Sequence, residues 1–200
     1  MIKAEYSNDK TFSTKVMVST AVLIAITFVM MHTPIGRIPN PIASATISHM
    51  PTLIAVMVFG LRSGLMVGFS FGAASLFTGI TSPIGILGPL FANPLVSILP
   101  RVLIPITTYF AYKALTSLFS GWDKKSLAAG AISSVIGSFT NTAGVAVMLY
   151  LVYAQRITEG IGSPARNLVV TIITTNGVAE AIAMALLVPP IVLVLRRVVK

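Results

Sequence analysis

The distribution of apolar residues constrains this chain more than any other feature of its sequence. Six apolar runs follow one another, separated by short segments rich in Gly, Pro or charged residues. They cover about residues 16–31, 47–59, 65–77, 91–112, 127–153 and 168–195. A helix needs roughly 20 residues to cross a hydrocarbon core of about 30 Å. The pattern predicts an all-α membrane protein, a six-transmembrane-helix bundle, whose short second and third segments are tucked into protein or completed by their flanks.

The composition excludes a soluble domain. Hydrophobic residues make up 55% of the chain and charged residues only 10%, whereas globular proteins carry about 25% charged residues to cover their cores. The absence of cysteine excludes disulfides and thiolate metal sites, and two histidines, His32 and His49, are too few for a histidine-rich metal site. We therefore expect one transmembrane domain over residues 1–200, with no metal and no cofactor.

The basic residues indicate how the chain is oriented. If the N-terminus is cytoplasmic, the inside segments hold ten basic residues and the outside segments three. The inside set is Lys3, Lys10, Lys15, Arg62, Lys113, Lys124, Lys125, Arg196, Arg197 and Lys200, and the outside set is Arg37, Arg156 and Arg166. Both termini are therefore predicted to be cytoplasmic, with residues 1–15 as an N-terminal segment before a first spanning helix rather than a cleaved signal. This asymmetry explains the net charge of +9 without a nucleic-acid partner.

Two charged residues, Arg101 and Glu180, lie deep inside predicted spans. Charged side chains are costly in hydrocarbon and usually mark a cavity or a partner. By helical rise, both lie near mid-membrane together with Asn141 and Asn176, and Asn176 precedes Glu180 by one turn. The four could form a structural ion pair with interhelical amide hydrogen bonds. Alternatively, Arg101 could offer two parallel donors to a carboxylate or phosphate, with Glu180 orienting it.

His49 and Asn93 lie nearer the outer ends of the second and fourth spans. A histidine at a helix end is either a local hydrogen-bonding group or a ligand contact. Asn93 precedes Pro94 in a span that also holds Pro100 and Pro105. Because prolines free backbone carbonyls, such breaks in membrane helices often line cavities, although they can also simply bend a helix. Both side chains are therefore possible ligand contacts.

Small residues recur at a spacing of four in two spans. Gly64, Gly68 and Gly72 share one face of the third span, which predicts close helix contact inside the bundle. Ala21 and Ala25 share a face of the first span. Their spacing is compatible either with packing inside the bundle or with an exposed face that docks another membrane protein.

Familiar catalytic motifs are missing from the sequence. It contains no GxxxxGK[S/T] phosphate loop, no HExxH and no GxSxG. An intramembrane enzyme is therefore a weaker hypothesis than a solute-binding transport subunit. A self-sufficient secondary carrier, with Glu180 as a titrating carboxylate, is a further alternative.

Several short motifs in one order resemble a known family. They are Ser48-His49-Met50-Pro51, the Gly60 to Gly64 turn, the glycines of the third span, Ser82-Pro83, and the run from Phe91-Ala92-Asn93-Pro94 to Pro100-Arg101. Together they resemble the substrate-binding S-components of energy-coupling factor (ECF) vitamin transporters. Many relatives have Leu-Gly-Pro where this chain has Phe59-Gly60-Leu61, a departure in a predicted cytoplasmic turn.

The resemblance implies a multi-pass subunit of an ABC-type importer in the bacterial cell membrane. It would capture a vitamin outside with high affinity and deliver it by toppling in the bilayer. A membrane coupling protein and two cytosolic ATPases would supply the energy, and Ala21 and Ala25 correspond to the family's docking residues. The segments Thr33 to Thr46 and Gly79 to Pro89 would cover the pocket.

The run ending in Arg101 is most similar to pantothenate-type members. An arginine at depth with amide side chains suits a ligand that has a carboxylate, hydroxyls and an amide. Hydroxymethylpyrimidine, a thiamin precursor or folate stays open, with Phe77, Phe91, Tyr150 and Tyr153 as possible stacking surfaces. The predicted substrate-binding set is Arg101, Asn93, Asn141, Asn176, Glu180 and His49.

Overall fold

The computed structural model describes residues 13–38, 45–83, 85–118, 123–162 and 164–199. Helices dominate this part of the chain. The α-helices are α1 (Thr14–His32), α2 (Met50–Phe59), α3 (Leu61–Thr81), α4 (Pro94–Ser97), α5 (Leu99–Leu118), α6 (Asp123–Ile161), α7 (Ala165–Thr171) and α8 (Val178–Val199). Two 3-10 turns, η1 (Pro34–Gly36) and η2 (Gly88–Ala92), and a π-helix, η3 (Ile172–Gly177), complete the helical elements. Strands β1 (Arg37–Ile38) and β2 (Ala45–Thr46) pair antiparallel, an addition that the all-α prediction did not include.

Within the described residues, five helical stretches are long and apolar enough to cross a membrane. They are Thr14–His32, Leu61–Thr81, Pro94–Leu118, Leu127–Gly160 and Ala165–Val198. The sixth apolar segment is α2, which has only 10 residues, as its short run predicted. The short third run is completed by its flanks, one of the two alternatives expected from the sequence, because α3 continues through flanking Gly, Ser and Thr residues to a length of 21 residues.

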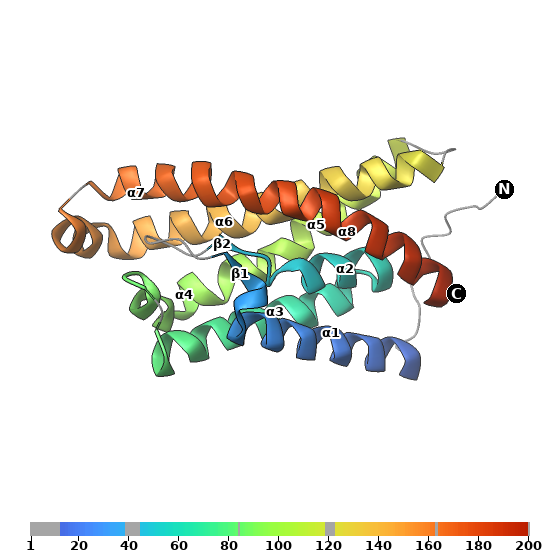
Figure 1. Ribbon diagram of the computed structural model, residues 1–200, viewed down its shortest axis with the longest axis horizontal. Helices are drawn as coiled ribbons and strands as arrows, with labels where there is room; N and C mark the ends of the chain where they lie inside the picture. Colours follow the sequence, from blue (N-terminus) through green and yellow to red (C-terminus); the bar gives the residue numbers. More distant parts are fainter. Residues whose placement is uncertain (1–12, 39–44, 84, 119–122, 163, 200) are drawn as a thin grey trace.

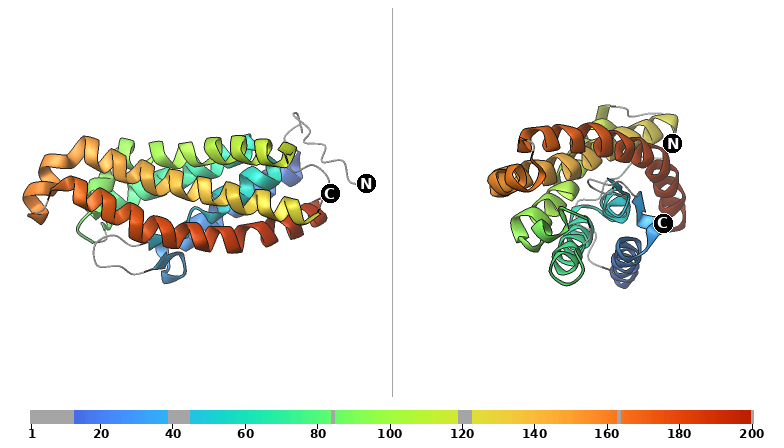
Figure 2. Two further views of the ribbon diagram at one scale, coloured as in Figure 1. Left: turned by 90° about the horizontal axis from the view of Figure 1, so that it is seen from above. Right: turned by 60° about the vertical axis from the view of Figure 1, so that its left-hand side comes forward.

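The long helices run side by side along the long axis of the molecule, and α2 fills only one half of that length (Figure 1). The β1–β2 hairpin lies near the first residues of α2. The helix α1 begins and α8 ends at the same end of the bundle, called here the α2 end, and the α6–α7 connection lies at the opposite end. Figure 2 shows the helices arranged around a common interior. That interior is therefore bounded at one end by α2.

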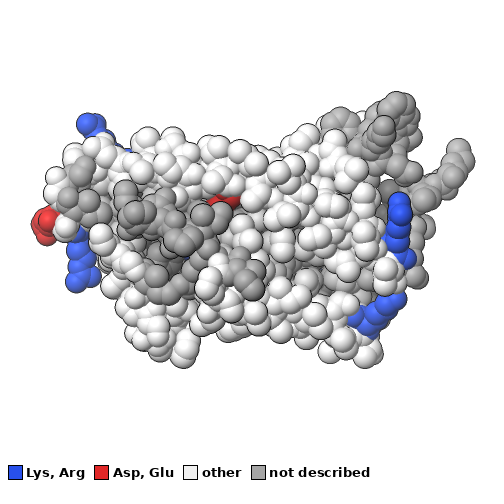
Figure 3. Space-filling view, viewed as in Figure 1, with Lys and Arg blue, Asp and Glu red and all other residues white. Residues whose placement is uncertain are grey.

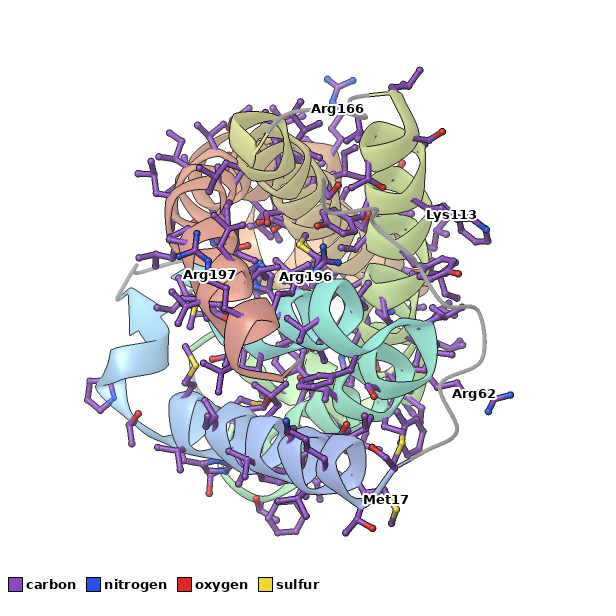
Figure 4. All side chains as sticks on the ribbon, turned by 90° about the vertical axis from the view of Figure 1, so that its right-hand side faces the viewer. Met17, Arg62, Lys113, Arg166, Arg196 and Arg197 are labelled. Carbon is purple, nitrogen blue, oxygen red and sulfur yellow. The ribbon has the colours of Figure 1, made fainter. Side chains whose placement is uncertain are left out.

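The surface has the apolar character of a lipid-facing protein. Large side chains on several helices are more than half exposed, including Phe69, Phe77, Phe110 and Leu186. Lys and Arg gather at the two ends of the face in Figure 3, where the middle is mostly uncharged. Figure 4 looks at the α2 end, where Arg62 and Lys113 project away from the bundle.

The glycines of α3 let α2 and α5 approach closely, as their spacing predicts. A Cβ atom at Gly68 would lie 2.7 Å from the carbonyl oxygen of Arg101, and one at Gly72 would lie 2.8 Å from Cα of Ile98. One at Gly64 would collide with Val56. The helix pairs α2–α3 and α3–α5 therefore depend on having no side chain at these three positions.

At the α2 end, Arg196 ties three helices together. Its Nε and Nη2 atoms donate to the carbonyl oxygen of Met57 at 3.2 and 2.5 Å, and its guanidinium lies 5.0 Å from the ring centroid of the buried Tyr112. The Met57 carbonyl lies in the last turn of α2, where carbonyls lack helical partners and a cation is favoured. Arg196 of α8 therefore fixes the short helix α2 against α5.

Candidate ligand-binding site

The helix that carries Arg101 is broken just before it. The single predicted span is divided into η2, α4 and α5, with the break at Ile98. In a continuous helix the carbonyl of Val96 would accept from the backbone nitrogen of residue 100, but Pro100 has no N–H. The Arg101 Nη1 atom donates to that carbonyl instead, at 2.8 Å. The proline therefore creates the acceptor that anchors the arginine.

Aromatic rings complete the surroundings of Arg101, which is 5% exposed. The guanidinium carbon lies 5.3 Å from the ring centroids of both Phe71 on α3 and Phe91 on η2, within cation–π range. The Arg101 Nε atom is buried and has no hydrogen-bond partner among the described residues. A buried donor without a partner costs about 1–3 kcal/mol, so this nitrogen is positioned for a bound acceptor.

Glu180 on α8 connects three elements of the interior. Its carboxylate accepts from the backbone N–H of Thr46 on β2 and from the hydroxyl of Thr142 on α6, each at 2.6 Å. It makes no ion pair within 4.0 Å with Arg101. The structural ion pair considered from the sequence is therefore not formed, because each charged group makes its hydrogen bonds to other neighbours.

His49 and Asn141 add further unpaired polar atoms to this interior. His49 is fully buried before the first turn of α2, and no described residue forms a hydrogen bond within 3.5 Å of either ring nitrogen. Asn141 on α6 is 4% exposed, and its side-chain oxygen has no partner among the described residues. Together with Arg101, these residues supply three kinds of polar group. Arg101 on α5 supplies a cation, His49 at the N-cap of α2 supplies an imidazole that can donate or accept, and Asn141 on α6 supplies an acceptor.

The remaining predicted contacts are Asn93 and Asn176, and the second histidine, His32, lies at the surface. Asn93 caps α4, its Oδ1 accepting from the N–H of Leu95 at 2.9 Å, and it is only half-buried. Asn176 is buried on η3, one turn before Glu180. His32 is exposed and bonds to the carbonyl of Phe28. The structure thus places Asn176 near Glu180, and gives Asn93 a capping bond that uses its oxygen.

The predicted docking residues lie on the outside of the bundle. Ala21 and Ala25 are exposed, whereas Thr20, Leu23 and Thr27 on the opposite side of α1 are buried. The predicted covering segments are only partly described, because residues 39–44 and 84 lie outside the described residues. Residues 1–12, with the predicted cytoplasmic Lys3 and Lys10, also lie outside them. Of the aromatic candidates, Phe91 lies beside Arg101, while Phe77 and Tyr150 are exposed.

Comparison with known proteins identifies the family to which this chain belongs. The family model described as "ECF transporter, substrate-specific component" matches residues 15–192. The chain belongs to that family. It is therefore a transport subunit and a multi-pass protein of the bacterial cell membrane, as the order of its motifs predicts.

Two curated relatives of this ECF component are similar over most of its length. The "Pantothenate transporter PanT" of Leuconostoc mesenteroides subsp. mesenteroides is 28% identical over 194 residues, covering 92% of each chain. The "Pantothenic acid transporter PanT" of Lactococcus lactis subsp. cremoris is 26% identical over 167 residues, covering 77% of this chain and 78% of the relative. Both names refer to the same vitamin.

Sequence patterns did not indicate several partners in the site of this ECF component. Phe71 and Thr142 look like ordinary span residues, and nothing in the sequence pairs Thr46 with Glu180 across 134 positions. The π-helix η3 leaves no simple sequence signature either. One signal was available: Pro100 lies four residues after Val96, which predicts a free carbonyl there.

Proposed function

We propose that this ECF component binds pantothenate with high affinity from outside the cell and passes it to an energising complex. The observation that carries the proposal is the buried Arg101, whose Nε atom has no partner within the described part of the chain, where His49 and Asn141 also have unpaired atoms. A carboxylate would pair with the guanidinium, and hydroxyl or amide groups would pair with the other two. The names of both relatives support pantothenate as that ligand.

The six predicted site residues divide by role in this proposal. Arg101, His49 and Asn141 contact the ligand, because each has at least one buried polar atom without a hydrogen-bond partner among the described residues. Asn176 lines the same interior. Glu180 and Asn93 position the site through bonds to protein groups, Glu180 between β2 and α6 and Asn93 at the start of α4.

Isothermal titration of the purified chain tests the ligand directly. We expect tight binding of pantothenate, weakened at least thirty-fold by Arg101→Ala, because losing a buried hydrogen bond to a charged group costs about 2 kcal/mol and each 1.4 kcal/mol is tenfold. Arg62→Ala is the matched control, since Arg62 is exposed at the α2 end. Tight binding of another vitamin instead would show that pantothenate is not the ligand, without affecting the family assignment.

The orientation completes the proposal: six membrane-spanning helices, with both termini cytoplasmic. The basic residues at the α2 end, including Arg62, Lys113 and Arg197, support it (Figure 4). Because the chain has no cysteine, single substitutions can report topology. We expect Arg197→Cys to react only with a membrane-permeant maleimide, and Arg166→Cys to react also with an impermeant one; the reverse pattern would invert the topology.

The partners in this proposal are a membrane coupling protein and two cytosolic ATPases, with Ala21 and Ala25 as the docking face. Their exposure supports that role. Ala21→Phe and Ala25→Phe should keep pantothenate affinity and abolish uptake in cells, while Val22→Phe, on the adjacent exposed face, should have a smaller effect. Uptake that persists without the ATPases would favour a secondary carrier.

A further inference from the structure

We propose that Phe71 and Phe91 are positioning residues that orient Arg101 to present its Nε edge to a carboxylate, and so set the preference for an acidic ligand. This inference rests on the proposed function, because it concerns the same arginine. It adds two residues to which the sequence patterns assigned no such role.

The first step is the geometry of the guanidinium itself. Its donors are fixed in one plane, and the Nε–H points to the same side as one N–H of Nη2. Nη1 is already bound to the Val96 carbonyl. The side that includes Nε is therefore the one left for a ligand, and it can hold both oxygens of a carboxylate in parallel bonds.

The guanidinium needs more than one contact to stay in that orientation. One hydrogen bond to Val96 leaves rotation about that bond unrestrained. The rings of Phe71 and Phe91, both 5.3 Å from the guanidinium carbon, restrict this rotation and attract the cation with little water present. A side chain that is already held loses less entropy when a ligand binds.

The third step is that the protein holds both rings in place. Phe71 is 2% exposed within α3. The carbonyl of Phe91 accepts from the hydroxyl of Ser97, and a Cβ atom at Gly79 would lie 2.6 Å from the carbonyl carbon of Phe91. Thus α3 supplies one ring directly and, through the absence of a side chain at Gly79, lets η2 bring in the other.

The test compares pantothenate with pantothenol, its neutral alcohol analogue, by titration of the purified chain. Phe91→Leu and Phe71→Leu should each weaken pantothenate binding about tenfold, which is about 1.4 kcal/mol, since each removes a desolvated cation–π contact. Pantothenol affinity should change less than about twofold. Phe91→Trp keeps an aromatic face at this half-buried position, so this variant should retain the wild-type preference for pantothenate over pantothenol.

Two further variants separate orientation from packing. Phe110→Leu is the control, because Phe110 is 61% exposed on α5 and should change neither affinity. In an Arg101→Gln background, Phe91→Leu should no longer alter the ratio of the two affinities. A parallel loss of both ligands, or a ratio that still changes without the arginine, would overturn the inference.

If the wild-type chain binds neither compound, the proposed function fails by itself. The same variants are then compared by thermal unfolding with propionate and with 1-propanol. The wild type should be stabilised by propionate over propanol, and Phe91→Leu should lose most of that difference. An unchanged difference in Phe91→Leu, or none in the wild type, would reject the positioning role.

Discussion

The two halves of the bundle differ in how regular their backbones are. Around α2, the helices are continuous and the core is dense: Leu53, Val67, Ile104 and Met184 are all fully buried. The opposite half contains η2, the break before α5, the π-helix η3 and a non-helical residue, Tyr153, within α6. Breaks in transmembrane helices are tolerated where other groups satisfy the freed backbone atoms.

This difference explains where the proposed site lies. The irregular half frees the Val96 and Phe91 carbonyls, and side chains of Arg101 and Ser97 bind them. The regular half contributes His49, which is buried at the N-cap of α2. Regular helices therefore supply a rigid base, and the broken ones supply polar groups at membrane depth. The following substitutions test this contrast, beginning with the largest expected effect.

Filling the glycine face of α3 should disrupt the regular half most. Gly68→Val places a branched side chain where even a Cβ atom would lie 2.7 Å from the carbonyl oxygen of Arg101. We expect a loss of about 3 kcal/mol in unfolding free energy, since overpacking forces backbone shifts, with a lower melting temperature and poor expression. Gly160→Ala in α6 meets no atom within 4 Å and should be neutral; equal effects at both positions would contradict the contrast.

Removing the contacts of Arg196 with α2 and α5 should have the next largest effect on stability. Arg196→Gln removes the charged bonds to the Met57 carbonyl and the contact with Tyr112. The expected cost is about 2 kcal/mol, measured as a lower melting temperature in detergent. The neighbouring Arg197 is exposed, so Arg197→Gln should leave it unchanged. If both variants behave alike, Arg196 does not hold α2.

Removing the N-cap of α4, in the irregular half, should lower stability by a smaller amount. Asn93→Ala removes the bond to the Leu95 N–H and should cost about 1 kcal/mol of stability. Asn93→Ser preserves a capping oxygen and should keep both stability and pantothenate affinity within a few-fold. Loss of affinity in the serine variant with normal stability would show that the amide contacts the ligand instead.

The smallest effect is expected at Thr108 in the regular half. Its hydroxyl is fully buried, has no hydrogen-bond partner among the residues that the structure describes, and packs against Gly137 of α6. Thr108→Val is nearly isosteric and removes the unpaired group, so stability should stay within about 1 kcal/mol and change in the stabilising direction. A clear loss of stability would show that the hydroxyl binds an internal water molecule.

Much of the fold was predictable because its causes are local in sequence. The apolar runs predicted the membrane helices, and the glycine spacing predicted the close contacts of α3. For the third span the sequence left two alternatives open, and the structure shows that its flanks continue the helix. Asn93 was predicted as a possible ligand contact, and its capping bond to the N–H of Leu95 was not foreseen from the sequence.

The sequence by itself determined that polar groups would lie at membrane depth on particular helices, because composition and helical periodicity are properties of single segments. Only the tertiary structure decided how those groups pair. Glu180 binds Thr46 and Thr142 rather than Arg101, and Arg101 binds a carbonyl freed by its neighbouring proline. Such pairs depend on the relative rotation and depth of packed helices. These arise from the packing of all the side chains between them, and no short spacing in the sequence records them.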